Sequence, residues 1–397
     1  MEQELTKIYD IAWTKKEVID NLLPSQAAET GVVATPLRRG RHRHVSPAAL
    51  VTKNPSEIKV LSDQLTSRIL LGLLDGKKYT RYLELHLAEY TQTLPKGRGY
   101  VNIALLPRAD ESWDHVLSSL HVLGDELVDT FLVLLAVALD TNGAEHMTIP
   151  FALTPDDILA ICQKKKSKGS YSVRQRQNVI EQLLTLARAS VHATLTLPQA
   201  KQRHIEGSLL EILTNGQSEE TEMRVRDECR QAFRLKIGDW ATMIPEQRYQ
   251  IAVLSRRVLR YHAREQRHEK RLGRYLTLLY RINAHKNEGQ VKVSMGVLLE
   301  RAGIIPDLDH PGRTQEAVES ALKQLHTDGV IGHFTPLVEN SSRGRETQER
   351  IRQHAYHWWD DYRQQLWLFD IPEYLKAVYL RGPRKTGVPN RKAGFPD

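Results

Sequence analysis

Apolar residues recur at helical spacing in one part of the chain and are followed by alternating segments. Residues 125–140 carry a dense apolar centre and predict a helix, after which 146–149 predicts a short strand. Thr154 and Pro155, followed by two aspartates, are typical of the start of a helix, which continues to Ile161. The elements that we expect next are a longer helix at 172–189 and strands at 191–197, 208–213 and 229–237.

A second stretch repeats much of this order with different residues. Residues 251–281 predict a strongly basic helix or helix pair, in which leucines and tyrosines stand between the arginines. The unit is expected to end near Pro336. The elements that we expect within it are a strand at 291–293, helices at 295–302 and 313–328, and a strand that begins near 330.

The rest of the chain divides by composition. The N-terminal region mixes Pro, Gly, Ser and basic residues, including RRGRHRH, and lacks periodicity. The aromatic residues of 354–380 favour the closing of a core over stacking on bases. We therefore expect a flexible basic region at 1–55, a helical and stranded preamble at 56–123, repeated units at 124–245 and 246–337, and an aromatic extension with a basic tail at 338–397.

Helix, strand, helix, turn, helix and hairpin is the order of a winged-helix domain, in which the last helix enters the major groove of DNA. The sequence therefore predicts an α+β, mainly helical fold with tandem winged-helix domains and with helical N-terminal and C-terminal extensions. The opening of the long helix is basic and follows the Gly-containing turn KKKSKG, so its outward face suits phosphate contacts.

Charge and composition limit the classes of partner that we expect for this protein. The 397 residues include 56 Lys and Arg against 48 Asp and Glu, a formal charge of +8 that favours a polyanion. Cys162 and Cys229 form no CxxC pair, so neither a zinc module nor a disulfide framework is expected, and no cofactor is implied. The longest apolar run, 131–139, is far shorter than the roughly 20 residues that span a bilayer. With no signal peptide apparent, we expect a cytoplasmic protein without membrane contact.

Four segments resemble the plasmid replication initiators of the Rep type, which carry two winged-helix domains in tandem. They are LTPDDILAI at 153–161, the turn KKKSKGSY, the helix RQRQNVIEQLLTLA, and RTQEAVESALKQLHTDGVIGHF in the second unit. The chain is also similar to initiator-like proteins of bacterial plasmids and mobile elements. The resemblance covers a little over half of the chain and implies binding of double-stranded DNA at origin repeats, recruitment of the host replicative helicase or its loader, and an equilibrium between monomer and homodimer.

The same resemblance implies which residues contact DNA. Side chains early in each recognition helix would meet base edges: Arg174, Gln175, Arg176, Gln177 and Asn178 in the first unit, and Arg313, Thr314, Gln315 and Lys323 in the second. The second unit, with fewer charges, is expected to contribute either these contacts or dimerisation. Phosphate contacts are expected from Lys164, Lys165, Lys166 and Lys168 in the turn, and from Arg256, Arg257, Arg260, Arg264, Arg267 and Arg271 in the basic helix.

Enzymatic alternatives have weaker support, and we expect a protein that is not an enzyme. His42 and His44 have the spacing of a rolling-circle metal pair but enclose an arginine, and His268 to Arg271 matches the HxxR letters of a tyrosine recombinase within an Arg-rich helix. No GxxxxGK[ST] loop occurs. A transcriptional regulator or a partition protein remains the alternative within the class of DNA-binding proteins, and a recombinase-type enzyme remains the alternative outside it.

Overall fold

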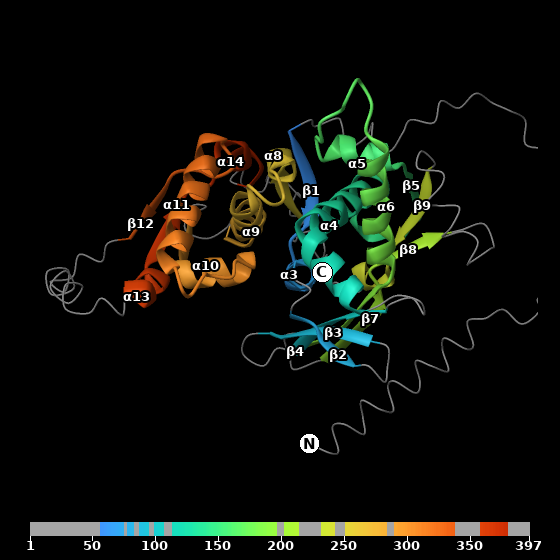
Figure 1. The fold of residues 1–397 in the computed structure, drawn as a ribbon, viewed down its shortest axis with the longest axis horizontal. Helices are drawn as coiled ribbons and strands as arrows, with labels where there is room; N and C mark the ends of the chain where they lie inside the picture. Colours follow the sequence, from blue (N-terminus) through green and yellow to red (C-terminus); the bar gives the residue numbers. More distant parts are fainter. Residues whose placement is uncertain are drawn as a thin grey trace, which may run out of the picture.

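The computed structural model describes residues 56–74, 78–82, 87–94, 99–106, 113–196, 202–213, 232–242, 251–283, 290–337 and 358–379. Helices and strands are mixed, as the expected α+β class requires, and they form two lobes (Figure 1). The expectations for residues 1–55, with RRGRHRH and the His42/His44 pair, and for the basic tail lie outside the described residues.

The first lobe is built on one long helix. Helix α4 (Trp113–Asn142) begins well before the helix expected at 125–140, and it is followed by the 3-10 turn η4 (Ala144–His146). The strand expected at 146–149 is therefore wrong, and β5 begins later. The next elements are β5 (Phe151–Leu153), α5 (Pro155–Ile161), α6 (Val173–Ala187), β8 (Leu210–Leu213) and β9 (Phe233–Ile237). Strand β9 lies between β5 and β8 and is antiparallel to both, so the strands expected at 208–213 and 229–237 pair with each other as a hairpin.

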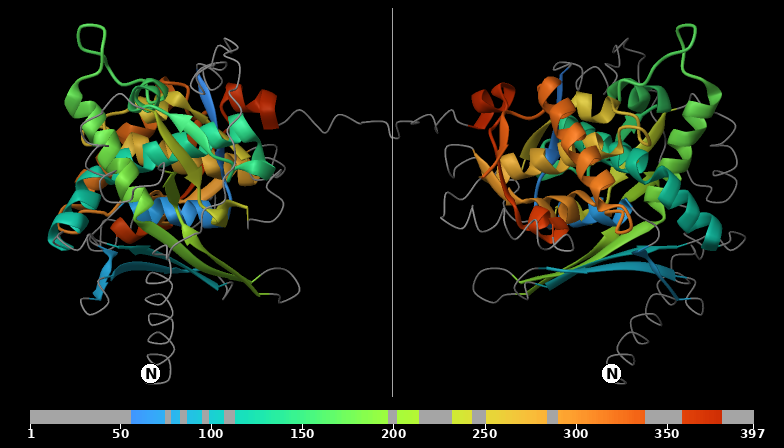
Figure 2. Two further views of the ribbon diagram at one scale, coloured as in Figure 1. Left: turned by 90° about the vertical axis from the view of Figure 1, so that its right-hand side faces the viewer. Right: turned by 60° about the vertical axis from the view of Figure 1, so that its left-hand side comes forward.

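A five-stranded antiparallel sheet lies beneath the helices of this lobe (Figure 2). Its strands, in spatial order, are β2 (Thr80–Tyr82), β3 (Leu87–Thr93), β4 (Gly99–Leu105), β6 (Ala189–Thr196) and β7 (Gln202–Ser208). The strand expected after the long helix is thus present as β6, but it pairs with β4 and not with the β8–β9 hairpin. The boundary expected at 123/124 falls inside α4, and the preamble shares a sheet with the unit that follows it.

Two strands from distant parts of the chain join the lobes. Strand β1 (Glu57–Leu61) pairs antiparallel with β10 (Ile251–Ser255), so the segment expected to be helical from residue 251 begins as a strand. Helix α3 (Gln64–Leu73) follows β1, and its N-cap Asp63 accepts a hydrogen bond from the Thr66 amide. After β10 the chain forms the short helix α8 (Arg256–Arg260) and then α9 (Arg267–Asn283).

The second lobe repeats the three-stranded sheet and two-helix part of the first. It contains β11 (Val291–Ser294), α10 (Met295–Ala302), α11 (Pro311–Thr327), β12 (Phe334–Pro336), α13 (Trp358–Gln364), β13 (Leu366–Phe369) and α14 (Glu373–Tyr379). Strand β13 lies between β11 and β12, with Trp367 and Phe369 buried. The aromatic segment therefore closes a core, as its composition predicts, and the boundary expected at residue 337 falls within this sheet.

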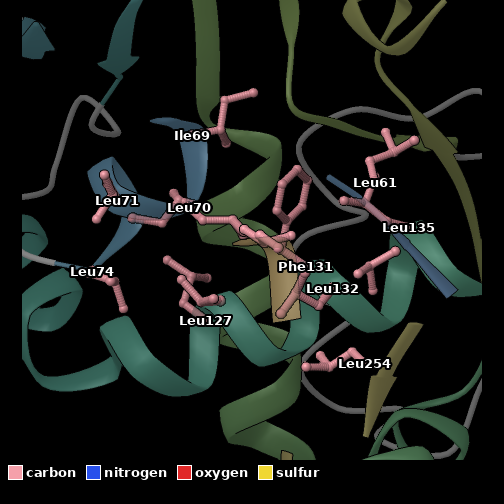
Figure 3. Close-up of a cluster of buried hydrophobic side chains, with 14 of the residues drawn as sticks. Leu61, Ile69, Leu70, Leu71, Leu74, Leu127, Phe131, Leu132, Leu135 and Leu254 are labelled. Carbon is pink, nitrogen blue, oxygen red and sulfur yellow. The ribbon is translucent and has the colours of Figure 1, made fainter. Parts of the chain in front are cut away.

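Helix α4 is the centre of the hydrophobic core. Figure 3 shows Phe131, Leu132 and Leu135 of α4 near Leu61 of β1 and Leu254 of β10, and all five side chains are almost fully buried. Close approach of α3 to α4 requires a glycine at position 124, where a Cβ would lie 2.5 Å from the Leu74 carbonyl oxygen. Residues 131–139 of this helix are apolar and buried on every side, because other elements surround this part of it.

Acidic residues of α4 and basic residues of α9 form a buried ion cluster, defined as Asp125, Asp129, Lys270, Arg271 and Arg274. Arg274 donates to Asp125 Oδ1 at 2.9 Å and to Asp129 Oδ1 at 2.5 Å, and the Lys270 ammonium donates to Asp129 and to two carbonyl oxygens of α8. Lys270 is 0% exposed. Because a buried charge is costly without partners, this cluster ties the helix of one lobe to that of the other.

The cluster makes the protein sensitive to acid. Burial raises the pKa of Asp125, but the positive charges of Arg274 and Arg271 outweigh this effect and hold it below its ordinary value of 3.8. A depressed carboxyl pKa contributes stability above the unfolded-state pKa and loses it as the pH falls through the folded-state pKa. The free energy of unfolding is therefore expected to fall as the pH drops below about 4. Denaturant unfolding at several pH values measures this dependence. The free energy of unfolding should change less with pH for Asp125→Asn than for the unchanged protein, and an equal dependence on pH would contradict the assignment.

Candidate nucleic-acid interface

The helices α5 and α6 both begin with strong local signals. Thr154 accepts from the Asp157 amide at 3.1 Å while the Asp157 carboxylate accepts from the Thr154 amide at 2.9 Å. Ser172 and Gln175 form the same reciprocal pair at the start of α6. These capping boxes satisfy amides that a helix start leaves without partners, so both starts are set by their own sequence.

A tight basic hairpin, residues 165–170, separates the two helices. The Ser167 amide donates to the Ser170 oxygen at 2.9 Å, and the Ser170 amide donates back at 3.1 Å. Lys168 and Gly169 between them have φ of 49° and 83°, the positive values that a type I′ turn requires. Glycine adopts such a conformation without strain, which explains its position here. The basic hairpin projects beyond the helices, as the green loop above α5 and α6 in Figure 1 shows.

Exposed polar side chains gather along the basic hairpin and the first turns of α6. They are Lys165, Lys166, Lys168, Arg174, Gln177 and Asn178. Lys166 lies 5.1 Å from the centre of the ring of the buried Tyr171, a cation–π contact that orients it. Within the described part of the chain, no carboxylate forms an ion pair with Lys165, Lys168 or Arg174. This surface therefore carries positive charge that none of the described residues neutralises.

Gln175 and Arg176 face the protein. Gln175 is half-buried and donates to the Lys165 carbonyl oxygen at 3.2 Å, which holds the hairpin against α6. Arg176 is 4% exposed, and its guanidinium donates to both carboxylate oxygens of Asp156, at 2.6 and 3.0 Å. The expected base contact by Arg176 is therefore corrected: its side chain joins α6 to α5 and does not reach the surface.

An expected phosphate contact is also corrected. Arg256 is buried and donates to the carbonyl oxygens of Ile161 and Ala160, at 3.0 and 2.9 Å. A cation at a helix C-terminus satisfies carbonyl groups and complements the helix dipole, so Arg256 supports α5. Lys164 lies 3.4 Å from Glu126 of α4 and is only partly exposed. Of the four lysines in the turn, the other three are exposed.

The basic segment after residue 256 is mostly structural. Arg271 belongs to the buried ion cluster, donates to Asp125 at 2.9 Å and also donates to the Gly303 carbonyl, so its expected phosphate contact is wrong as well. Arg267 is 38% exposed and lies 3.2 Å from Asp125, and Arg257 donates to the Asp328 carbonyl at 2.6 Å. Arg260 and Arg264 are exposed. The HxxR letters at 268–271 therefore include an arginine that is committed to a buried ion pair.

Sequence reasoning missed the acidic half of the buried ion cluster. Asp125 and Asp129 stand four residues apart, and the cations at 267, 270, 271 and 274 stand at spacings that put them on one face of a helix. Matching stripes of opposite charge on these two helices are the signal that could have identified the pair.

The corresponding corner of the second lobe differs in charge. Thr314 is buried and accepts from the Asp307 amide at 3.0 Å, so its expected base contact is also corrected. Gln315 donates to Glu319 at 2.8 Å, and Arg313 and Lys323 are exposed. The turn before α11 is acidic and apolar, with Leu308 75% exposed, where the first lobe has lysines.

The described residues offer little to other kinds of site. Among them, no group of three or more His, Cys, Asp or Glu residues is arranged to hold a metal ion. The helices within the same residues include none with the length and apolar character needed to cross a membrane.

No protein-family model and no curated protein matches this chain. Two solved structures are similar to it at a low level. One is the crystal structure of domains 2–3 of RctB, with a TM-score of 0.39 and 9% identity over 79% of this chain and 99% of that one. The other is a selenomethionine derivative of domains 2 and 3 of RctB, with a TM-score of 0.36 and 10% identity over 71% of this chain and 86% of that one. Scores this low carry no argument about function.

Proposed function

We propose that this protein binds double-stranded DNA in a sequence-specific manner through the basic hairpin and helix α6. The observation that carries the proposal is a positive surface of three exposed lysines beside the first turns of an amphipathic helix, with no carboxylate among the described residues paired to Lys165 or Lys168. Phosphates attract such lysines without regard to sequence, whereas side chains at the start of an inserted helix can reach base edges. The chain thus brings an affinity element and a specificity element together at one corner.

The order of elements supports a winged-helix unit in each lobe. In the first, α4, β5, α5, α6 and the β8–β9 hairpin follow one another, and the last strand lies between the other two. In the second, α9, β11, α10, α11, β12 and β13 follow the same order with the same strand arrangement. We assign α6 and α11 as the recognition helices of the two units.

Arg174, Gln177 and Asn178 are the proposed base-reading residues of the first unit. An arginine pairs in a bidentate manner with guanine, and Asn or Gln pairs with adenine. In the second unit only Arg313 and Lys323 remain exposed among the expected contacts, and the acidic Glu316 is exposed on the same helix. We therefore assign the larger share of DNA affinity to the first unit.

Among DNA-binding proteins we propose a plasmid or mobile-element replication initiator, which rests on the sequence resemblance. A host helicase or its loader and an equilibrium between monomer and homodimer are the partners that this assignment implies. A transcriptional regulator or partition protein is the alternative. Repeats of about 20 base pairs beside an AT-rich stretch, bound by the purified protein, would favour the initiator. A covalent adduct with DNA that is lost in a tyrosine variant would instead favour a recombinase.

The affinity element is tested by changing all three exposed lysines of the hairpin. Binding to a site selected from random DNA should weaken in K165A/K166A/K168A, and the slope of log K against log salt should fall by up to about 0.9 for each phosphate that is no longer neutralised. The cause is the release of fewer counterions. Fluorescence anisotropy at several salt concentrations measures both quantities.

The matched control is K78A/K292A/K376A, which removes the same charge from other elements. This control should leave the salt slope nearly unchanged because its lysines lie outside the proposed interface. Equal loss of slope in the two triple variants would mean that net charge alone, and not this hairpin, determines DNA affinity.

A further inference from the structure

A pocket of about 240 Å³ lies between the lobes and has a lining that the DNA interface does not use. Helix α3 contributes Arg68, Leu70 and Leu71, α9 contributes Leu278 and Leu279, and α10 contributes Arg301. Arg271 joins these elements, because it donates to the carbonyl oxygen of Gly303 just after α10 and to that of Leu74 just after α3, the latter at 3.4 Å. Figure 1 shows α3 and α10 on the two sides of this junction.

Positive charge in the pocket is incompletely satisfied. Arg68 is 7% exposed, and its buried Nη1 has no hydrogen-bond partner among the described residues. The buried Nε of Arg274, which also lines the pocket, has none there either. A buried donor without a partner carries a desolvation cost, so each of these nitrogens would gain from an acceptor.

The neighbours of Arg68 add to this imbalance. Burial lowers the pKa of Arg68, and the positive charge of Arg301 lowers it further. Arg301 lies 3.8 Å from Glu300, a carboxylate whose side chain is 64% exposed, so the pair is weak and faces solvent. Arg68 and Arg301 thus share the pocket with Arg271 and Arg274, which are paired with buried aspartates, while the carboxylate that acts on Arg68, Glu300, is largely exposed.

The remaining walls are apolar. They include leucines of α3 and α9, and the volume is slightly below that of ordinary small-molecule sites. An inorganic anion alone would leave this apolar surface in contact with water. A hydrocarbon without charge would leave the guanidinium nitrogens unsatisfied. The lining fits a molecule that has both parts.

We propose that this pocket binds a small aliphatic carboxylate, with its charged group at Arg68 and Arg301 and its hydrocarbon chain against the leucines of α3 and α9. The ligand would contact helices of both lobes. This small-molecule site is separate from the proposed DNA interface, and the proposal of the site does not depend on the proposed function.

The proposal is tested on the full chain by isothermal titration calorimetry with octanoate, 1-octanol and inorganic phosphate. Octanoate should bind at one site, while octanol and phosphate should bind about tenfold more weakly or not at all, since each lacks one of the two parts. Arg68→Met keeps an unbranched side chain and should weaken octanoate binding about tenfold or more. Its thermal stability should stay the same or rise, because it removes a buried charge.

Arg301→Met is the second variant. Arg301 is more exposed than Arg68, so its replacement disturbs folding less. It should also weaken octanoate binding, whereas Arg363→Met, which removes an exposed arginine from α13, should not. The proposal is overturned if octanoate does not bind at millimolar concentration, or if octanol binds as tightly. It is also overturned if either pocket variant that folds binds octanoate as tightly as the unchanged protein, or if Arg363→Met loses binding equally.

Discussion

Replacing Asp129 with alanine is expected to lower the free energy of unfolding by about 3–5 kcal/mol. The substitution leaves the Lys270 ammonium, which is 0% exposed, and one guanidinium nitrogen of Arg274 without their carboxylate. Both cations are buried, and the loss of an ionic partner in such a place costs more than the pair contributes when intact. Denaturant unfolding followed by the fluorescence of tryptophans measures the change.

The control for this prediction lies on the same helix. Asp140→Asn breaks a pair with Lys59, whose side chain is 62% exposed, and should cost at most about 1 kcal/mol. Asp129→Asn should behave like the alanine variant, because an amide cannot balance the charge. Addition of Lys270→Met to Asp129→Asn should recover part of the loss. If Asp129→Asn were as mild as Asp140→Asn, the buried ion cluster would not hold the lobes together.

Two arginines separated by one residue are expected to give opposite phenotypes. Arg174→Ala should reduce binding to the selected DNA site by about 1–3 kcal/mol, the range for removal of a bidentate base contact, and should leave protein stability unchanged. Arg174 is exposed on the first turn of α6. Arg176→Ala should instead lower stability by roughly 1.5–3 kcal/mol, because it removes hydrogen bonds between charged groups that join α6 to α5.

The ratio of specific to unrelated DNA binding distinguishes the two effects. Arg174→Ala should reduce that ratio, and Arg176→Ala should keep it, because the remaining folded protein still presents the same surface residues. Competition binding with selected and scrambled DNA measures the ratio, and thermal unfolding measures the stability. If Arg176→Ala lowered the ratio of specific to unrelated DNA binding without lowering stability, Arg176 would have to be assigned to the DNA interface.

Elements with strong local signals could be predicted from the sequence. Helices α5 and α6 begin at capping boxes that their own residues form, and β11, α10 and α11 were also expected close to their observed bounds. The pairing of β1 with β10, and the insertion of β13 between β11 and β12, could not be predicted. Such pairs join segments far apart in the chain, and the alternation of one strand does not specify its partner.

The candidate site shows the same division. The basic hairpin, Arg174, Gln177 and Asn178 were expected on the surface and lie there. Arg176, Arg256 and Arg271 were expected to contact DNA but are buried. An arginine on the outward side of a helix and one that faces a distant aspartate look alike in the sequence, because the partner belongs to another element. Only the tertiary structure distinguishes a cation that is paired within the protein from one that can still contact DNA.

The position of β13 has a consequence for the synthesis of this protein. This strand is the middle one of its sheet, yet it is made after both of its neighbours. During translation β11 and β12 emerge with no strand to separate them, and their open edges must wait for residues 366–369. The second lobe can therefore complete its sheet only after residues 366–369 have been made, and a chain that stops before them would expose strands suited to pairing with other chains.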